Sequence, residues 1–450
     1  MIGAAASPTI RTHPPPCRGF SAPSSEIRGN PGSPCASPRM DAPGPRPILP
    51  AMSALPAPMS DPLRVVVAGA GVGGLEALVA LRALAGDRVA PTLVAPDRAF
   101  SLRALGVFEP FGLGRPQEYP LTEIAADLGA AWRRDAVAAV DRARHEVRLR
   151  SGQTLPYDVL LVSVGAVPYP AFDHGVCFDR TREAAQFDEL LADARAGLAR
   201  HVAVVVPRGA GWPLPGYELA LLLAAFGRED GVRVTLATAE PEPLADFGPQ
   251  AGALVRSELA AAGVELVAGV EATVPTDTVV ELRDGRRVLP DRIVHMPLLA
   301  GPRIAGLPHD RAGFIAVDTE LRAGGDPDVY AVGDGTAGPH KHGGMAADQA
   351  AAAAERIAWR AGGEHPPRRY APALRALLRT EHGPRYLRAE PPGGVGECVV
   401  SGTPLWWPPS KVAARWLTPW LASRELSGRP LPPPRVLPSG GISRGSLYRL

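Results

Sequence analysis

The chain has 450 residues, 46% of them hydrophobic and 21% charged, and its formal net charge is +2. These values are ordinary for a globular protein of two to three domains. They give no electrostatic basis for binding nucleic acid. No run of about 18 apolar residues predicts a transmembrane helix.

The first 60 residues are rich in proline, serine, glycine and alanine and show no apolar periodicity. Such a segment cannot bury enough surface to offset the entropy cost of ordering it, so a disordered tail over 1–60 is expected. A transit peptide is the alternative, because the segment contains arginine and serine and few acids. Met59 stands where a compact domain would begin.

From Leu63 onward, strands and helices alternate. The segment 61–170 begins with an apolar strand, a glycine turn and a helix, and ends in short strands separated by a Ser-Gly turn. The segment 171–298 repeats this plan, and both segments carry V-x-L-R-[Ser/Asp]-G followed shortly by Leu-Pro. The duplication predicts an α/β fold with two Rossmann-type units, each followed by a β-meander.

Two further segments complete the chain. Residues 299–362 contain two predicted strands and the helical run "GGMAADQAAAAAERIAWRAGG". Residues 363–450 begin with a Pro- and Arg-rich stretch and end in a segment dense in tryptophan, which we interpret as a C-terminal interface segment.

The first glycine turn has the spacing G-x-G-x-x-G, formed by Gly69, Gly71 and Gly74. It directly follows a strand and opens a helix, the context in which such glycines bind a dinucleotide. The first glycine makes the tight turn, the second lets the backbone approach a pyrophosphate, and the third lets helix and strand pack closely. Asp97 is the candidate acid for the ribose, although it lies two residues beyond the usual position. An exposed turn aspartate is the alternative.

The second glycine turn departs from this spacing. Trp212 and Pro213 stand where a phosphate cradle needs space and backbone N–H groups. A helix is still expected to start near Pro215, because proline suits a first helical position. Glu240 follows the next strand and is a candidate for a ribose. We therefore expect a Rossmann shape here, with NAD(P)H binding left open.

The segments "VVVAGAGVGGLEAL", "LLVSVGAVP" and "VYAVGDGTA" resemble FAD-dependent pyridine-nucleotide-disulfide oxidoreductases, above all sulfide:quinone reductases and type II NADH dehydrogenases. The resemblance implies FAD held by a domain made of 61–170 and 299–362, with 171–298 as an NAD(P)-like domain. It implies that the aspartate of "GDG" binds the flavin ribityl chain. It also implies that the following helix, expected from about Gly344, points its N-terminus at the flavin pyrimidine edge. The implied cofactor-binding residues are Gly69, Ala70, Gly71, Gly73, Gly74, Asp97, Gly165, Gly333, Asp334, Lys341 and Gly344.

Lysine occurs only twice in the chain, at Lys341 and Lys411. The sulfide:quinone group carries a lysine before the flavin helix, so the resemblance implies that Lys341 stabilises anionic reduced flavin, as a helix dipole would. A solvated loop lysine is the alternative. His340 and His342 flank it, as proton donors or as ordinary polar loop residues.

Four cysteines, Cys17, Cys35, Cys177 and Cys398, show no C-x-x-C spacing. A disulfide framework is therefore not expected, and the usage is typical of a reducing cytoplasm. Resemblance to sulfide:quinone reductases implies that Cys177 and Cys398 receive sulfur, with lone buried cysteines as the alternative. Gln349 is all that remains of the A-Q-x-A-x-Q-Q motif of type II NADH dehydrogenases. No spacing of ligands predicts a metal site.

The C-terminal segment holds four of the seven tryptophans, at positions 406, 407, 416 and 420. A short helix is predicted from Ser410 to Leu417, stopped by Pro419, with Lys411 and Arg415 sharing a face. Tryptophan with basic residues is typical of a membrane interface, so we expect a cytoplasmic protein with peripheral contact to the inner membrane face. Packing against the protein's own flavin domain, or against a second copy in a homodimer, is the alternative.

Two functions follow. The first is an FAD-dependent oxidoreductase that moves electrons from a small donor, such as sulfide, a thiol or NAD(P)H, to a quinone-type acceptor. The second is a redox-inactive protein of the same fold that acts as a binding or assembly partner.

Overall fold

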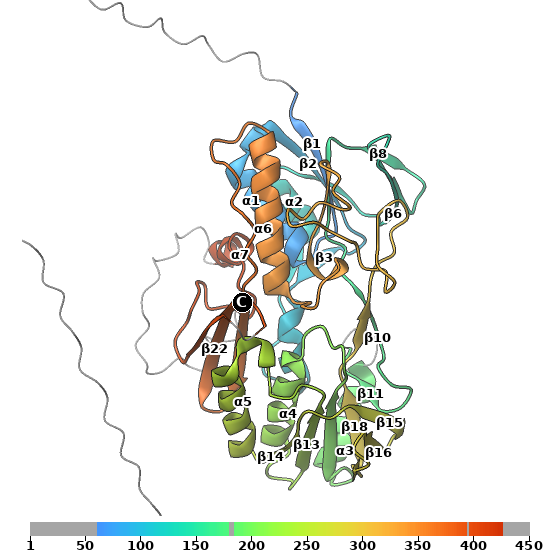
Figure 1. Cartoon of the computed structure of the whole chain (residues 1–450), viewed down its shortest axis with the longest axis vertical. Helices are drawn as coiled ribbons and strands as arrows, with labels where there is room; N and C mark the ends of the chain where they lie inside the picture. The colour runs from blue at the N-terminus through green and yellow to red at the C-terminus, as the bar shows by residue number, and fades with distance from the viewer. Residues whose placement is uncertain (1–60, 180–183, 394–395, 426–450) are drawn as a thin grey trace, which may run out of the picture. The chain divides into compact units, whose positions relative to one another are not determined.

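The computed structural model describes residues 61–179, 184–393 and 396–425. The predicted disordered tail over 1–60 lies outside these residues. The described residues form two five-stranded sheets, three three-stranded sheets and two two-stranded sheets, and helices pack on the larger ones (Figure 1).

The first sheet has the order β20-β9-β1-β2-β5, and all neighbours are parallel. In β1, Val65, Val66, Val67 and Ala68 are all buried, as expected for a strand covered on both faces. Helix α1 packs beside α6, which comes from the far end of the sequence (Figure 1). The elements are β1 (Leu63–Ala68), α1 (Val72–Leu84), β2 (Val89–Val94), α2 (Leu121–Asp127), β5 (Ala131–Arg133), β9 (Val159–Val162), β20 (Val329–Ala331) and α6 (Gly343–Arg360).

The second sheet repeats this topology, with the parallel order β11-β18-β12-β13-β14. Strand β12 is buried along its whole length, and α4 is almost entirely apolar because it lies between this sheet and the C-terminal sheet. The elements are β11 (Val176–Cys177), α3 (Ala184–Arg195), β12 (His201–Val206), α4 (Leu214–Phe226), β13 (Arg233–Thr238), α5 (Pro249–Ala261), β14 (Val264–Val267) and β18 (Arg292–His295).

An antiparallel meander accompanies each parallel sheet, at the place where the two segments share their sequence pattern. The first consists of β6 (Val137–Asp141), β7 (Glu146–Leu149) and β8 (Thr154–Pro156). The second consists of β15 (Ala272–Thr276), β16 (Val279–Leu282) and β17 (Arg287–Val288). The predicted fold class, α/β with two Rossmann-type units and two β-meanders, is thereby confirmed.

Short elements fill the connections. Strands β10 (Val167–Tyr169) and β19 (Leu298–Ala300) pair with each other, as do β3 (Ala99–Ser101) and β4 (Glu118–Pro120). The 3-10 helices are Gly86–Arg88, Arg103–Phe111, Ala245–Phe247 and Gly333–Gly335.

The stretch after α6 forms an antiparallel sheet, β21-β22-β23, followed by one more helix. Strand β21 contacts α4 and α6, and β23 contacts α5. No strands were predicted from the sequence for this stretch, although residues 374–401 form three of them. The elements are β21 (Leu374–Thr380), β22 (Gly383–Glu390), β23 (Glu397–Ser401) and α7 (Leu417–Glu425).

The helix predicted from Ser410 to Leu417 is wrong. Residues 410–416 are not helical, and α7 begins at Leu417. Pro419 lies in the first turn of α7, where its missing N–H would have no intrahelical partner, so this proline starts a helix and does not stop one. Lys411 is paired with Glu218 of α4, and its side chain is 5% exposed. Val412 is buried as well, so the basic face expected at a membrane interface does not form.

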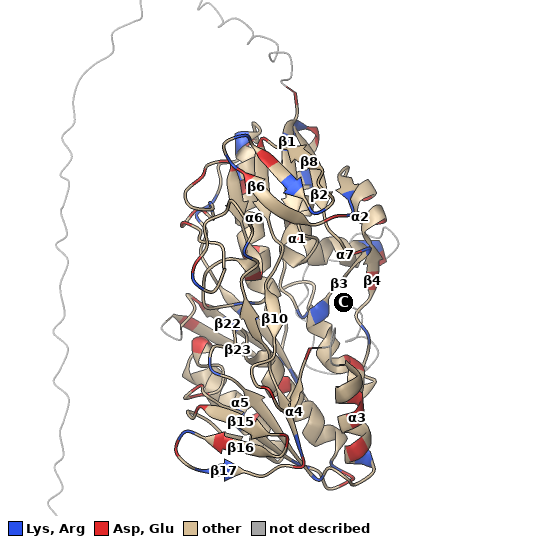
Figure 2. Ribbon diagram, turned by 90° about the vertical axis from the view of Figure 1, so that its right-hand side faces the viewer, with Lys and Arg blue, Asp and Glu red and all other residues tan. Residues whose placement is uncertain are grey.

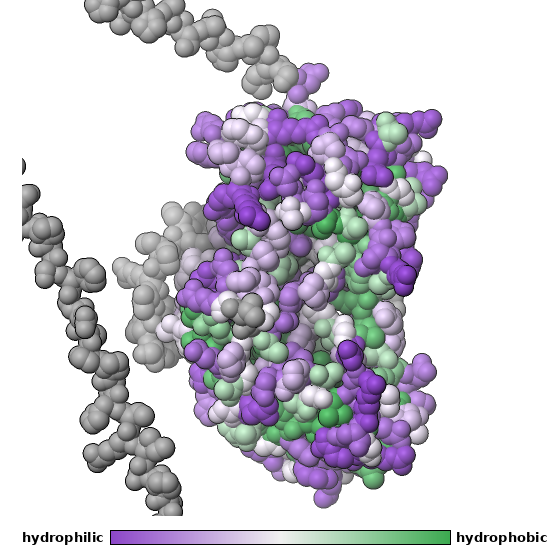
Figure 3. All heavy atoms as spheres, in the orientation of Figure 1, coloured by the Kyte–Doolittle hydropathy of each residue, from purple (hydrophilic) through white to green (hydrophobic). Residues whose placement is uncertain are grey.

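Surface properties match the modest net charge. In Figure 2, acidic and basic residues are scattered over the upper and lower parts of the ribbon, and several acidic residues follow one another along α3. On the face drawn in Figure 3, hydrophilic and hydrophobic residues are intermixed. In the part of the chain that the structure describes, every helix is too short or too polar to cross a bilayer.

Candidate functional site

A cavity of about 780 Å³ opens where the strands of the first sheet end. Its wall includes the loop after β1, the ends of β2 and β9, and the N-terminus of α6. The carboxyl ends of parallel strands are where α/β sheets bind ligands. Other residues that line it are Gly211, Trp212, Leu214, Pro215, Met296 and Leu299 of the second unit, and Arg375, Lys411 and Val412 of the C-terminal region.

The glycine turn after β1 is shaped by contacts with its own neighbours at two positions. Gly69 has φ +105°, and a Cβ there would lie 2.2 Å from the carbonyl oxygen of Ser163. A Cβ on Gly74 would lie 1.9 Å from the carbonyl oxygen of Gly69, so only glycine lets α1 approach the strand this closely. These are the first and third positions of the predicted motif.

The second position behaves differently. Gly71 has φ −77°, which any residue can adopt, and a Cβ added there would meet no protein atom within 4 Å. It caps α1, whose first N–H groups face the cavity with a favourable dipole for an anion. Neither backbone strain nor packing explains a glycine at this position, but a phosphate group in contact with the backbone does.

The Gly-Asp pair after β20 lies opposite this turn. The backbone N–H of Gly333 donates to Oε1 of Gln349 at 2.6 Å, so this glutamine holds the turn in place. Asp334 lines the cavity, and burial raises the pKa of its carboxyl to about 6, against the opposing effect of Lys341. The pair therefore presents a carboxylate acceptor to the cavity.

Lys341 is not a solvated loop lysine, because it is only 8% exposed. Its Nζ donates to the carbonyl oxygen of Thr336 and lies 3.9 Å from the centroid of the Phe314 ring. Burial lowers the pKa of Lys341, and Asp334 opposes that shift. The ammonium is therefore held by a carbonyl, a ring face and a nearby carboxylate at the cavity wall.

The two histidines beside Lys341 have separate environments. Nε2 of His340 contacts Asp246 at 2.9 Å. His342 caps α6, and its Nδ1 accepts from the N–H groups of Gly344 and Met345 at 3.2 and 3.4 Å. Burial lowers the pKa of His342 to about 3. A neutral imidazole is a weak acid, so this environment favours the capping role of His342 over the role of proton donor.

The second glycine turn packs against Lys341 and His342. The Trp212 ring stacks on His342 with centroids 4.1 Å apart, and the Gly211 carbonyl accepts from the N–H of Lys341 at 2.9 Å. A Cβ on Gly211 would lie 2.5 Å from Cγ of Lys341, so the aliphatic part of the lysine side chain packs directly on this glycine. A phosphate has no room at that point. Helix α4 starts at Leu214, close to the predicted position near Pro215. Glu240, the candidate for a ribose, accepts from the Tyr217 hydroxyl at 2.6 Å.

The sequence model of the pyridine nucleotide-disulphide oxidoreductase family matches residues 63–354 of this chain. The chain belongs to this family. An NADH dehydrogenase-like protein of Mycobacterium tuberculosis is 30% identical over 296 residues, which cover 60% of this chain and 72% of that protein. The demethylphylloquinone reductase of Synechocystis is 26% identical over 305 residues, covering 61% and 72%.

Among solved structures, the sulfide:quinone oxidoreductase of Aquifex aeolicus superposes with a TM-score of 0.67 at 20% identity, over 75% of this chain and 86% of that one. A ferredoxin reductase from Rhodopseudomonas palustris superposes with a TM-score of 0.55 at 22% identity, covering 74% and 83%. At these identities the likeness concerns the fold. The resemblance recognised in the sequence is confirmed at the level of the pyridine nucleotide-disulphide oxidoreductases.

FAD is the cofactor that this membership implies, and the cavity fits it. The open space at Gly71 suits a pyrophosphate, and the Asp334 carboxylate suits ribityl hydroxyls. Every predicted cofactor-binding residue except Gly74 lines the cavity, and Gly74 acts by packing α1 against the turn. Asp97 is exposed at the cavity wall, where the adenosine end of the cofactor would lie if the pyrophosphate occupies the space at Gly71.

The two cysteines named for sulfur transfer do not come together in this member of the family, and neither lines the cavity. Cys177 is 2% exposed in the edge strand β11, paired with His295. Cys398 lies in β23 against α5, a helix that packs on β14 at the opposite edge of the second sheet. Burial also raises the pKa of the Cys398 thiol, which lowers its thiolate fraction.

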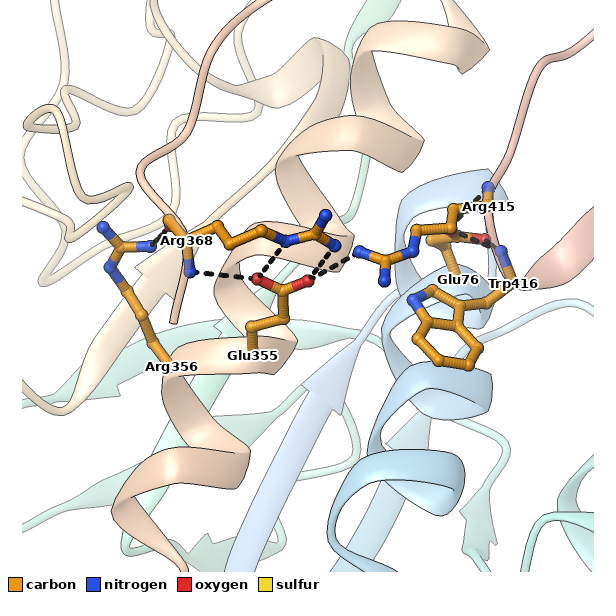
Figure 4. A network of polar contacts seen from close by, with 6 residues as sticks. All are labelled: Glu76, Glu355, Arg356, Arg368, Arg415 and Trp416. Carbon is orange, nitrogen blue, oxygen red and sulfur yellow. Dashed lines mark hydrogen bonds and ion pairs between the residues drawn. The ribbon is translucent and has the colours of Figure 1, made fainter. Parts of the chain in front are cut away.

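Sequence reasoning missed two contacts that tie the C-terminal region to the site. Glu76 of α1 is fully buried and accepts from the N–H groups of Arg415 and Trp416 at 2.9 to 3.1 Å (Figure 4). It also accepts from the N–H of Leu417 at 2.6 Å. Lys411 pairs with Glu218 and donates to the carbonyl of Leu377 at 2.6 Å. The rarity of lysine was the available signal, since both lysines of the chain line this cavity.

No group of three or more histidine, cysteine, aspartate or glutamate side chains within 61–179, 184–393 and 396–425 could hold a metal ion. The polar groups that line the cavity are instead backbone N–H groups, the carboxyls of Asp97 and Asp334, both lysines, and the neutral imidazole of His342, together with arginines that include Arg375. This set has the chemistry needed to bind and orient a dinucleotide and to place positive charge beside it.

Proposed function

We propose that the protein is an FAD-dependent oxidoreductase that passes electrons from a small donor to a quinone-type acceptor. The observation that carries the proposal is the cavity wall itself, where the Gly71 turn, Asp334 and Lys341 converge. Bound FAD would supply the two-electron redox chemistry. The residues position the cofactor and set its electrostatic surroundings.

A quinone-type acceptor is supported by the relatives and by the cavity wall. Two of the proteins described above are a demethylphylloquinone reductase and a sulfide:quinone oxidoreductase. Beyond the glycine turn, the wall carries the apolar side chains of Leu214, Met296 and Val412. Apolar walls with a few placed polar groups are the usual surroundings of an aromatic ligand.

The donor is proposed to be a small molecule other than NAD(P)H. In the second unit, Trp212 stacks on His342, and Glu240 is engaged by Tyr217. The turn that would cradle a second dinucleotide is therefore filled by the chain's own side chains. A sulfide donor acting through Cys177 and Cys398 is not supported either, since both lie away from the cavity wall.

We expect NADH to reduce the FAD-bound protein slowly, with a second-order rate constant below about 10³ M⁻¹ s⁻¹, under the low end of ordinary kcat/KM values. Anaerobic stopped-flow absorbance measures this, with NADPH, sulfide and dithiothreitol as parallel donors and a soluble quinone as reoxidant. Rapid bleaching by micromolar NADH would overturn the choice of donor. Flavin that no donor reduces, or that quinone fails to reoxidise, would overturn the proposed function.

Lys341→Met should lower the reduction potential of the bound flavin by about 30–60 mV, the equivalent of one lost charge-assisted contact in a two-electron couple. Methionine keeps the stem that packs on Gly211 but removes the ammonium, and with it the charge that favours an anionic reduced cofactor. Spectroelectrochemical titration gives the potential. Lys341→Arg keeps the charge and serves as the matched control, which should remain near the wild-type value. An unchanged potential in an FAD-bound Lys341→Met protein would refute this role.

A further inference from the structure

Arg375 of β21 lines the cavity and uses only part of its hydrogen-bonding capacity within the protein. One terminal nitrogen, Nη1, donates to Oδ2 of Asp348 on α6 at 2.6 Å, and the two side chains are 24% and 21% exposed. Nε and Nη2 have no hydrogen-bond partner among the described residues, and both retain accessible surface. A guanidinium group carries one N–H on Nε and two on each terminal nitrogen, so three donors of Arg375 are available to a ligand.

The guanidinium group lies at the end of the cavity where α6 begins. Burial, followed by the charges of His340 and Arg375, lowers the pKa of His342 to about 3, which places Arg375 close to this cap of α6. Strand β21 contacts both α6 and α4, and Leu214 at the start of α4 lines the same wall, as does Val412. The available donors of Arg375 therefore belong to the α6 end of the cavity, the part of its wall that α6, α4 and the C-terminal region form.

Each lysine or arginine in the wall of the α6 end has a carboxylate neighbour. The three pairs are Lys341 with Asp334, Arg375 with Asp348, and Lys411 with Glu218. Opposite charges a few ångströms apart cancel most of each other's field at longer range. The protein itself therefore offsets the positive charge at this end of the cavity.

The opposite end of the cavity, beside β2 and β5, is not balanced in this way. Arg103 follows β3, and the N–H of Arg150 donates to the carbonyl of Ala136, just after β5. Both arginines line the cavity, both are exposed, and neither forms an ion pair with a carboxylate of the described residues. Two unpaired guanidinium groups suit the phosphates of a dinucleotide, whereas the balanced α6 end suits an uncharged ligand.

We propose that the acceptor is an uncharged quinone and that the available N–H groups of Arg375 donate hydrogen bonds to one of its carbonyl oxygens. Asp348 is a positioning residue, because it holds the guanidinium through Nη1 and offsets its charge. The site thereby gains donors without attracting anions, which an unpaired arginine would favour. The inference rests on the proposed function, because it specifies the acceptor of that reaction.

Arg375 takes no part in the proton balance of the reaction. Reoxidation of reduced flavin by a quinone transfers two electrons and two protons and yields a quinol. Guanidinium groups keep their protons in proteins, so Arg375 supplies neither the electrons nor the protons. It orients the carbonyl group and favours the negative charge that develops on the oxygen as electrons arrive.

The test compares two soluble quinones, menadione, which is uncharged, and 1,2-naphthoquinone-4-sulfonate, which carries one negative charge. Stopped-flow absorbance follows the reoxidation of photoreduced, FAD-bound protein by each quinone and gives a second-order rate constant. Asp348→Asn keeps the shape of the side chain and removes its charge, so the rate constant for the sulfonate should rise about fivefold relative to that for menadione. Arg375→Met removes the donors and should lower the rate constant for menadione by about fivefold to tenfold, the worth of one hydrogen bond.

Arg388→Met is the matched control. Arg388 is the direct cross-strand neighbour of Arg375 in β22, its side chain is 42% exposed and it does not line the cavity, so both rate constants should stay within about twofold of wild type. The inference is wrong if Asp348→Asn leaves the ratio of the two rate constants unchanged, or if a folded Arg375→Met protein reacts with menadione at the wild-type rate. Asp348→Asn preserves the side-chain volume, so its result stands even where Arg375→Met does not fold. Reduced wild-type flavin that neither quinone reoxidises would instead overturn the proposed function.

Discussion

Replacing Gly71 with valine should abolish FAD binding and leave the protein folded. The backbone at this position has φ −77°, and a new Cβ meets no protein atom within 4 Å, so the fold accommodates the side chain. The methyl groups would occupy the space that we assign to the pyrophosphate. We expect the dissociation constant to rise by at least about a hundredfold, because a steric clash at a phosphate contact cannot be relieved by a rigid turn.

Isothermal titration with FAD and a urea unfolding curve, measured on the same preparation, check both parts. Gly74→Ala is the matched comparison, since its Cβ would lie 1.9 Å from a backbone oxygen and should destabilise the fold itself. A Gly71→Val protein that binds FAD normally would show that the turn does not hold the cofactor. One that fails to fold would show that the space at Gly71 is needed by the protein and not by a ligand.

Glu76→Ala should cost about 3 kcal/mol of unfolding free energy, because it leaves the N–H groups of Arg415, Trp416 and Leu417 buried without their acceptor. The carboxyl belongs to α1 and the N–H groups open α7, so the loss should also release the C-terminal region. Urea unfolding and limited proteolysis after residue 401 measure the two effects. The comparison is Glu123→Ala, which removes an exposed partner on α2 of Arg424, a residue of α7. This change should cost no more than about 0.5 kcal/mol.

The same carboxyl makes a pH prediction. Burial raises the pKa of Glu76 to about 7 from an ordinary 4.5, so between these values the folded state binds a proton that the unfolded state has released. Stability should therefore fall as pH rises from about 5 to 7 through this group. Glu76→Gln cannot titrate and should flatten that part of the curve. An identical pH profile in the two proteins would contradict the assignment.

Local sequence was enough to predict the first glycine turn, the Gly-Asp pair and both meanders. Each depends on residues within one strand-turn-helix or one hairpin, where spacing alone limits the conformation. The starting point of α4 was predicted for the same reason, since proline at a first helical turn is a local signal.

Partners distant in the sequence could not be predicted. Lys411 was assigned to an exposed face because Glu218, 193 residues earlier, does not appear in any local pattern. The separation of Cys177 and Cys398 could not be predicted for the same reason, because the order of the strands, and not composition, decides how far apart they lie. His342 was read as a polar loop residue, since histidine is not among the usual helix caps.

The order of strands in the first sheet affects how the chain folds during its synthesis. Strand β20 pairs with β9, and α6 packs against α1, so the sheet that begins at residue 63 is completed only by residues near 330 and beyond. The second sheet, by contrast, is built from the uninterrupted stretch between Val176 and His295. On a ribosome, chains fold from the N-terminus as they emerge, at about 5–20 residues per second. Strand β9 must therefore wait with one edge unpaired until β20 emerges, while the second sheet already has all its strands. Because the cavity also needs residues from 333 onward, we expect the cofactor to be captured only late in synthesis or by the released chain.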